Sequence, residues 1–152
     1  MAKLAFEKVV YFRMNGVRNF AQTKRQQDIV RNAELLAKDF SKRAALYDQN
    51  AEFPFENFQA LKDGGFLNLT IPKKYGGQDA GLYEFLLLQE TIAQGDGPTA
   101  LSLGWHLGIM MNAANNPSWP EDTYEKICKE IVQDKKLINS AHSEAKTGSP
   151  AR

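Results

Sequence analysis

The sequence predicts an all-α protein, a bundle of about five helices with a short extended C-terminal tail. Three observations lead to this prediction. Apolar residues recur at spacings of three and four positions along most of the chain, which is the period of helices with one buried face. Proline and glycine residues interrupt this pattern between the segments. One segment, 99–114, is apolar on most sides, as is typical of a central, buried helix.

A long first helix is expected from Thr23. Its apolar face would comprise Ile29, Ala33, Leu36, Phe40, Ala44 and Tyr47. Basic and acidic side chains alternate on the opposite face, which indicates a solvated surface with ion pairs along the helix. Phe53 ends this region, because a residue that precedes proline disfavours the helical conformation.

A second helix is expected to open at Pro54, since proline is tolerated at the first helical position. Its predicted inner side consists of Phe55, Phe58 and Leu61. Gly64 and Gly65 should stop this helix, because glycine adopts the left-handed conformation of a C-terminal cap at little cost.

The later elements follow from the same rules. Residues 66–74 are expected to be extended, and the loop that follows contains two permissive glycines. Helices are predicted at 82–94, 99–114 and 121–133, the first two separated by a Gly-Asp-Gly-Pro breaker. The acidic residues at the start of the last helix favour its positive N-terminal end. From residue 137 an extended segment, interpreted as a first strand, begins.

Composition restricts the class of protein. Lys and Arg number 19 against 18 Asp and Glu, so the net charge of +1 offers no electrostatic basis for binding nucleic acid. The single cysteine, Cys128, excludes an internal disulfide and suits a reducing compartment. No apolar run reaches the roughly 18 residues that a membrane span requires. The first 20 residues lack the pattern of a secretory signal, so a cytoplasmic protein is expected.

Two glycine-containing motifs carry a family resemblance. They are the string LKDGGF at 61–66 and the string IPKKYGG at 71–77, followed by Gly95-Asp96 and, four residues later, Ala100. Each glycine pair alone indicates only a cap or a turn, and no Gly-x-Gly-x-x-Gly motif accompanies them. The whole string resembles the N-terminal helical domain of the acyl-CoA dehydrogenase family over roughly residues 26–152.

The resemblance assigns the C-terminal tail to a flavin-binding segment. In that family the helical domain ends in the pattern Thr/Ser-Glu-Pro-x-x-Gly-Ser-Asp, which contacts FAD. The corresponding residues here would be His142, Ser143, Gly148 and Ser149. A hydroxyl beside the flavin ring tunes its electronics, and glycine with serine allows close approach and donation to a charged oxygen.

Two positions of this tail depart from the family pattern. Ala145 stands in place of the usual proline, and Pro150 stands in place of the usual aspartate. Since proline has no backbone N–H, a contact through that donor is lost. His142 and Glu144 share the tail, but two potential ligands do not make a zinc site, so no metal is expected.

The resemblance also implies a domain organisation. Residues 1–22 are interpreted as an N-terminal arm that is a leader, a vector-derived remnant or a packing element. Residues 23–136 would form the helical domain, and 137–152 the incomplete start of a middle β domain. The chain would then be the front part of a longer homo-oligomeric flavoenzyme and inactive alone.

The implied activity is α,β-dehydrogenation of an acyl-CoA with hydride transfer to FAD. The family's catalytic base is a carboxylate of the C-terminal domain, so no residue here is assigned that role. A flavin-dependent monooxygenase on the same scaffold is an alternative, in which His106 of the apolar fourth helix would face the flavin. A third reading is a non-catalytic helical protein that oligomerises or binds a partner.

Overall fold

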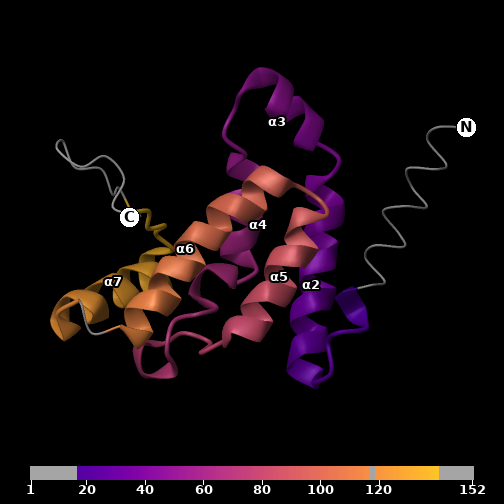
Figure 1. Cartoon of the computed structure of the whole chain (residues 1–152). Helices are drawn as coiled ribbons and strands as arrows, with labels where there is room; N and C mark the ends of the chain where they lie inside the picture. Colours follow the sequence, from indigo (N-terminus) through magenta and orange to yellow (C-terminus); the bar gives the residue numbers. More distant parts are fainter. Residues whose placement is uncertain (1–16, 117–118, 141–152) are drawn as a thin grey trace, which may run out of the picture.

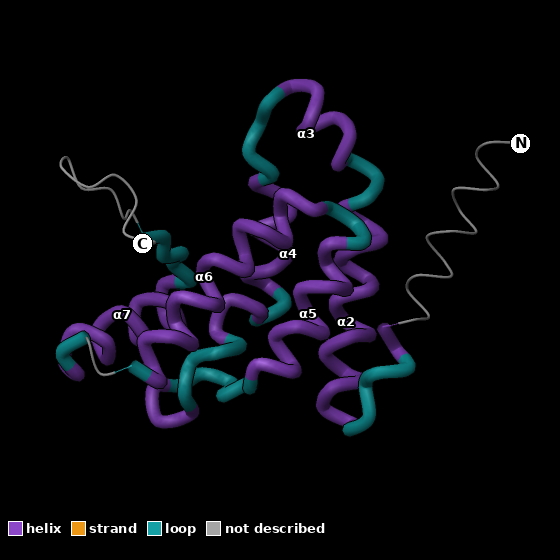
Figure 2. The backbone as a smooth tube through the Cα atoms, viewed as in Figure 1, coloured by secondary structure: helices purple, strands orange, loops and turns teal. Residues whose placement is uncertain are grey.

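A computed structural model describes residues 17–116 and 119–140 of the chain. The described residues contain six α-helices and no strand, which confirms the all-α prediction (Figures 1 and 2). The α-helices are α2 (Lys24–Phe40), α3 (Ala44–Asn50), α4 (Phe55–Asp63), α5 (Leu82–Ala93), α6 (Gly97–Asn115) and α7 (Glu121–Asp134), with two short 3-10 helices, η1 (Phe66–Asn68) and η2 (Lys73–Tyr75).

Local sequence explains where the longest helices begin. Thr23 caps α2 by accepting a hydrogen bond from the N–H of Gln26, and the Gln26 side chain accepts in return from the N–H of Thr23. Asp96 caps α6 through the N–H of Thr99, 3.2 Å away, and Pro98 occupies the first turn of that helix, where proline is tolerated.

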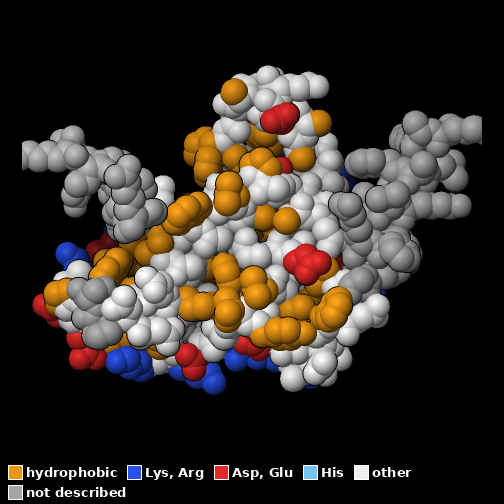
Figure 3. Space-filling model, in the orientation of Figure 1, with side chains coloured by type: hydrophobic (Ala, Val, Ile, Leu, Met, Phe, Trp, Pro, Cys, Tyr) orange, Lys and Arg blue, Asp and Glu red, His pale blue; other side chains and the backbone are white. Residues whose placement is uncertain are grey.

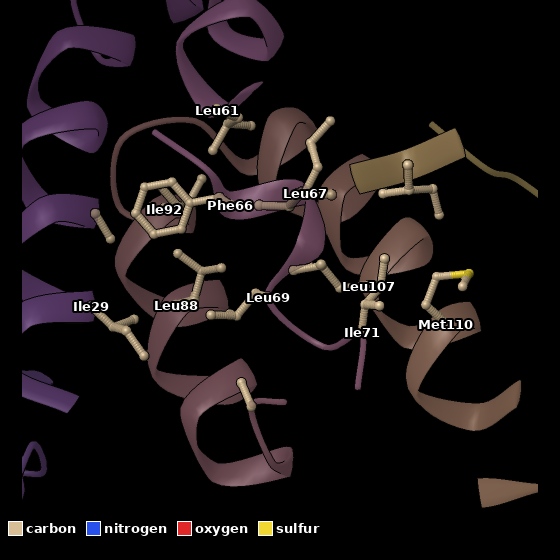
Figure 4. Packing of buried hydrophobic residues seen from close by; sticks show 14 of the residues in the cluster. Ile29, Leu61, Phe66, Leu67, Leu69, Ile71, Leu88, Ile92, Leu107 and Met110 are labelled. Atoms are coloured by element: carbon tan, nitrogen blue, oxygen red, sulfur yellow. The ribbon is translucent and has the colours of Figure 1, made fainter. Parts of the chain in front are cut away.

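The core lies where α5 and α6 pack together, with α2 on the far side of α5 (Figure 1). The largest fully buried side chains include Phe40, Leu61, Leu69, Ile71, Leu88, Ile92, Leu103, Leu107 and Met110. Figure 4 shows several of these side chains converging from α5, α6 and the η1 region. Burial of side chains of this size is the main stabilising contribution to such a bundle.

The single long helix predicted from Thr23 to Tyr47 was wrong. The chain leaves the α2 axis after Phe40 and starts a separate helix, α3, that buries no residue. No glycine or proline marks the break. After the break, Arg43 donates a 2.7 Å hydrogen bond to the side-chain oxygen of Asn57 in α4, a contact that the sequence pattern does not indicate.

The predicted inner side of α4 was wrong at Phe55. That side chain is 74% exposed, while Asn57 is completely buried beside Phe58 and Leu61. Hydropathy favoured Phe55, but positions 55 and 57 point to different sides of a helix, so the two side chains cannot both face the core. Asn57 lies inward because it hydrogen-bonds the groups at the start of α6.

One segment predicted to be extended differs. Residues 66–74 contain η1 and most of η2, although Leu69 and Ile71 accept backbone hydrogen bonds from Ala80 and Asp79 across the intervening loop. Residues 137–140 belong to no helix, and the rest of the extended tail predicted from residue 137 lies outside the described residues. The first strand of a middle domain therefore stays a prediction.

The described part of the N-terminal arm packs on the helices. Val17 and Ala21 form a small buried cluster with Val30 of α2 and Leu87 of α5. Arg18 pairs with the buried carboxylate of Glu34. Residues 17–21 therefore cover the junction between α2 and α5, which is the behaviour expected of a packing element.

Candidate functional site

All four residues predicted to bind the flavin, His142, Ser143, Gly148 and Ser149, lie outside the described residues. The structure describes the chain that leads to them. After α7 the backbone passes over the bundle in a segment that we term the C-terminal strap, residues 137–140. The candidate site is therefore built from the strap and from the helices that it reaches.

A groove on the surface of α5 and α6 has a volume of about 470 Å³ and includes the end of the strap. It is lined by Gln89, Leu101, Gly104, Trp105, Gly108, Ile109, Asn112 and Ser140. We term it the α5–α6 groove. Its volume lies within the range of small-molecule sites, and apolar side chains with a few polar groups are the usual lining of such sites.

Apolar residues that line this groove are exposed to solvent. Leu101 is 66% exposed and Trp105 57% exposed, although both belong to a strongly apolar helix. Hydrophobic side chains accordingly form a band over α5 and α6 on the face shown in Figure 3. The expectation that this helix is buried on most sides was wrong, because one of its faces is uncovered in this chain.

Gln89 provides the polar element of the groove. In the amide orientation that satisfies both neighbours, its nitrogen donates to the carbonyl of Ala100 at 2.7 Å and its oxygen accepts from the N–H of Gly104 at 3.2 Å. A Cβ at position 104 would approach the Gln89 side chain to 2.9 Å. Glycine at this position therefore leaves room for the amide to reach the α6 backbone.

His106 follows Trp105 in α6, about 100° farther around the helix axis, and its side chain is 1% exposed. Its Nε2 is 2.8 Å from the carbonyl oxygen of Leu67, and its Nδ1 accepts a hydrogen bond from the N–H of Ile138 at 3.1 Å. Because an N–H can only donate, Nδ1 carries no proton and the neutral ring has its proton on Nε2. Burial lowers the pKa of His106, which favours the same neutral form.

This geometry bears on the flavin-facing role predicted for His106. In the described chain both ring nitrogens are engaged by backbone groups, and the ring is directed into the core. A hydrogen bond to a flavin would require one of these contacts to open. The flavin-facing role stays a prediction.

Two sulfur-containing side chains, Met110 and Cys128, fall in the core. Met110 is fully buried and its carbonyl accepts a hydrogen bond from the hydroxyl of Tyr124, so it does not line the groove. Cys128 is also fully buried, and burial raises the pKa of its thiol, as for an unreactive cysteine. Within residues 17–116 and 119–140, no cluster of three potential metal ligands occurs.

The sequence predicted the apolar character of segment 99–114 but not the contributions of Gln89, Gly104 and Ser140 to the groove. A signal was present in the spacing of Gly104 and Gly108. Glycines four positions apart in an apolar helix lie on one face, where they leave space above the backbone. The contribution of Gln89 could not be read from the sequence, since it depends on the packing of α5 against α6.

Comparison with known proteins identifies the family. The family model described as "Acyl-CoA dehydrogenase, N-terminal domain" matches residues 23–117. The chain belongs to the acyl-CoA dehydrogenase family. This confirms the resemblance seen in the glycine-containing motifs, whose residues lie within the matched range.

Individual relatives of this acyl-CoA dehydrogenase family member are longer proteins. YdbM of Bacillus subtilis, whose name assigns it to the acyl-CoA dehydrogenases, is 42% identical over 133 residues, which are 88% of this chain and 35% of the relative. A 3-(aryl)acrylate reductase of Clostridium sporogenes is 27% identical over 134 residues, or 83% of this chain and 34% of the relative.

A 3-sulfinopropanoyl-CoA desulfinase of Variovorax paradoxus is 36% identical over 73 residues, or 47% of this chain and 18% of that relative. The chain thus spans about a third or less of the length of these relatives. The described residues contain no helix that is both long and apolar enough to cross a membrane.

Proposed function

We propose that this chain is the N-terminal helical part of an FAD-dependent oxidoreductase that dehydrogenates an acyl thioester between its α and β carbons. When bound, the flavin would accept the hydride that leaves the β carbon. The observation that carries the proposal is the apolar α5–α6 groove, which ends at the strap that leads to the predicted flavin segment. Family membership supplies the reaction type.

The lining of the groove suits an acyl chain. Leu101, Trp105 and Ile109 offer apolar walls, while Gly104 and Gly108 present no side chain that would fill the space between them. The volume of about 470 Å³ accommodates an extended hydrocarbon chain or a small ring. The proposed role of these residues is to bind and orient the apolar end of the substrate and to exclude water from it.

The position of Ser140 supports a flavin site beside this groove. Three residues of chain reach at most about 11 Å, so Ser143 would lie within that reach of Ser140, and a flavin that contacts Ser143 would lie near the same end of the groove. The chemistry of the predicted donors fits such a group. Ser143 and Ser149 would donate hydroxyl hydrogen bonds, and Gly148 would permit close approach of the backbone.

The groove has no carboxylate among its described lining residues. Removal of the α-proton needs a base, and the pKa of a carboxylate would have to suit that task. The proposal therefore assigns the base to the part of the enzyme outside this chain, as the resemblance implies. Within this chain, the assigned functions are substrate binding, substrate orientation and donation of hydrogen bonds to the cofactor.

The test uses the gene product purified from its natural source. We expect its intact mass to exceed 17.1 kDa and its visible spectrum to show flavin. Acyl-CoA added without oxygen should bleach the flavin band, since the hydride reduces it. Consumption of oxygen with hydroxylated product would support the monooxygenase alternative, and a colourless protein of 17.1 kDa would overturn both flavin readings.

A matched pair of variants tests the groove. Trp105→Ala should raise the KM for an acyl-CoA about tenfold or more, because loss of a large buried contact with substrate costs at least that factor. Leu35→Ala serves as the control, since Leu35 is 67% exposed on α2 and does not line the groove. Equal effects of the two substitutions would argue against the groove as the acyl site.

A further inference from the structure

The C-terminal strap is tied to the core at Ile138. Its backbone N–H donates to His106 Nδ1 at 3.1 Å, and its side chain packs half-buried against the core. The neighbouring Leu137 is 41% exposed. Ser140, two residues after Ile138, lines the α5–α6 groove. The anchor therefore lies directly before the point where the chain meets the candidate site.

The acceptor of this bond is held in place from the other side of the imidazole ring. Nε2–H donates to the carbonyl of Leu67 at 2.8 Å, and Leu67 is itself buried in η1. A hydrogen bond at one ring nitrogen sets the tautomer and orientation of the other. Leu67, His106 and Ile138 consequently form a chain of two hydrogen bonds that joins η1, α6 and the strap.

The same helix also carries the groove. Trp105 lines the groove, and the next residue of α6, His106, anchors the strap from the buried side of the helix. A single rigid element therefore determines both the wall of the groove and the place where the chain departs toward His142. Any displacement of the strap relative to α6 would alter the distance between the groove and the residues that follow.

We propose that His106 is a positioning residue, which holds the N–H of Ile138 and so fixes the strap, residues 137–140, at the end of the α5–α6 groove. The inference rests on the proposed function, in which the segment that follows the strap contacts the flavin. It assigns His106 a role through Ile138 and not through direct contact with cofactor or substrate.

Two substitutions separate positioning from simple core packing. In His106→Asn the side-chain oxygen takes the place of Nδ1 and can still accept from Ile138, while the bond to Leu67 is lost. In His106→Gln the side-chain nitrogen takes the place of Nε2 and can still donate to Leu67, while the acceptor for Ile138 is lost. Each variant removes one hydrogen bond and some ring volume, so a purely structural role predicts similar effects from both.

The first measurement is hydrogen exchange of the Ile138 amide in the 152-residue chain, by NMR. His106→Gln should accelerate this exchange by roughly threefold to tenfold, the factor set by one ordinary hydrogen bond, while His106→Asn should leave it near the wild-type rate. Melting curves of both variants verify that they fold. Equal exchange at Ile138 in the two folded variants, or an unchanged rate in His106→Gln, would overturn the proposal.

The second measurement follows flavin release from the purified natural protein. His106→Gln should release flavin severalfold faster than His106→Asn, because the strap leads to the predicted flavin segment; equal release rates would overturn this effect of the strap on the flavin. A wild-type protein without flavin would refute the proposed function, and with it the effect on the flavin, whereas amide exchange would still decide whether His106 holds the strap.

Discussion

Gly95 lies against the backbone of Ala37, so close that a Cβ on Gly95 would come within 2.1 Å of the Ala37 carbonyl oxygen. The contact joins the end of α2 to the turn between α5 and α6. Real Cβ atoms do not approach a backbone oxygen this closely, so glycine is required at position 95 for α2 to pack at its observed distance.

Gly95→Ala should therefore lower the free energy of unfolding by about 1–3 kcal/mol, the range for overpacking a tight contact. Urea unfolding of the isolated chain provides the measurement. Gly97→Ala is the control, because a Cβ at Gly97 meets no atom within 4 Å. The control should change stability by less than about 0.5 kcal/mol. If the two variants had equal free energies of unfolding, the tight packing of Gly95 against Ala37 would be contradicted.

A buried polar network holds α4 to the start of α6. The Asn57 side chain donates to Thr99 Oγ1 at 2.9 Å and to Asp96 at 3.3 Å, and it accepts from Arg43 at 2.7 Å. Asn57→Ala should lower the free energy of unfolding by about 2–3 kcal/mol, because Arg43, Asp96 and Thr99 lose a hydrogen-bond partner. Gln59→Ala, at an exposed position of the same helix, should cost only a few tenths of a kcal/mol in the same unfolding assay.

Stability should depend on pH through His106. Burial lowers its pKa in the folded chain, whereas the unfolded value is about 6.5. Below about pH 6.5 the unfolded state binds more protons, so the free energy of unfolding falls as the pH falls toward the folded pKa. Above that pH the full contribution is present.

His106→Asn removes this titration. The stability difference between the wild type and the variant should therefore shrink as the pH is lowered from about 7 to about 5. Urea unfolding at a series of pH values measures it. A difference that stays constant over this interval would show that the pKa of His106 is not lowered by folding.

The isolated chain should associate with itself through its uncovered apolar face. Leu82, Leu86, Leu101 and Trp105 are each more than half exposed on α5 and α6. Large exposed apolar patches favour association. Leu101→Gln combined with Trp105→Gln should reduce the mass measured by light scattering at high concentration. Leu35→Gln on α2 should not, and a monomeric wild type at that concentration would refute the prediction.

Local rules predicted most helix positions and the family. A break between α5 and α6 occurs as expected, although α6 already begins at Gly97, and Gly65 adopts the left-handed conformation after α4. The break after Phe40 escaped these rules, because no glycine or proline marks it and Arg43, which follows it, bonds a residue 14 positions away. The same limit applies to the groove, since hydropathy gives the apolar character of α6 but not which face stays uncovered.

By itself the sequence determined the helix period, the caps at Thr23 and Asp96, and the motifs of the acyl-CoA dehydrogenase family, because these depend on residues near one another in the chain. Only the tertiary structure decided the partners of His106, which lie 39 and 32 positions away at Leu67 and Ile138. Such pairs form when packing brings distant segments together, and no local pattern specifies them.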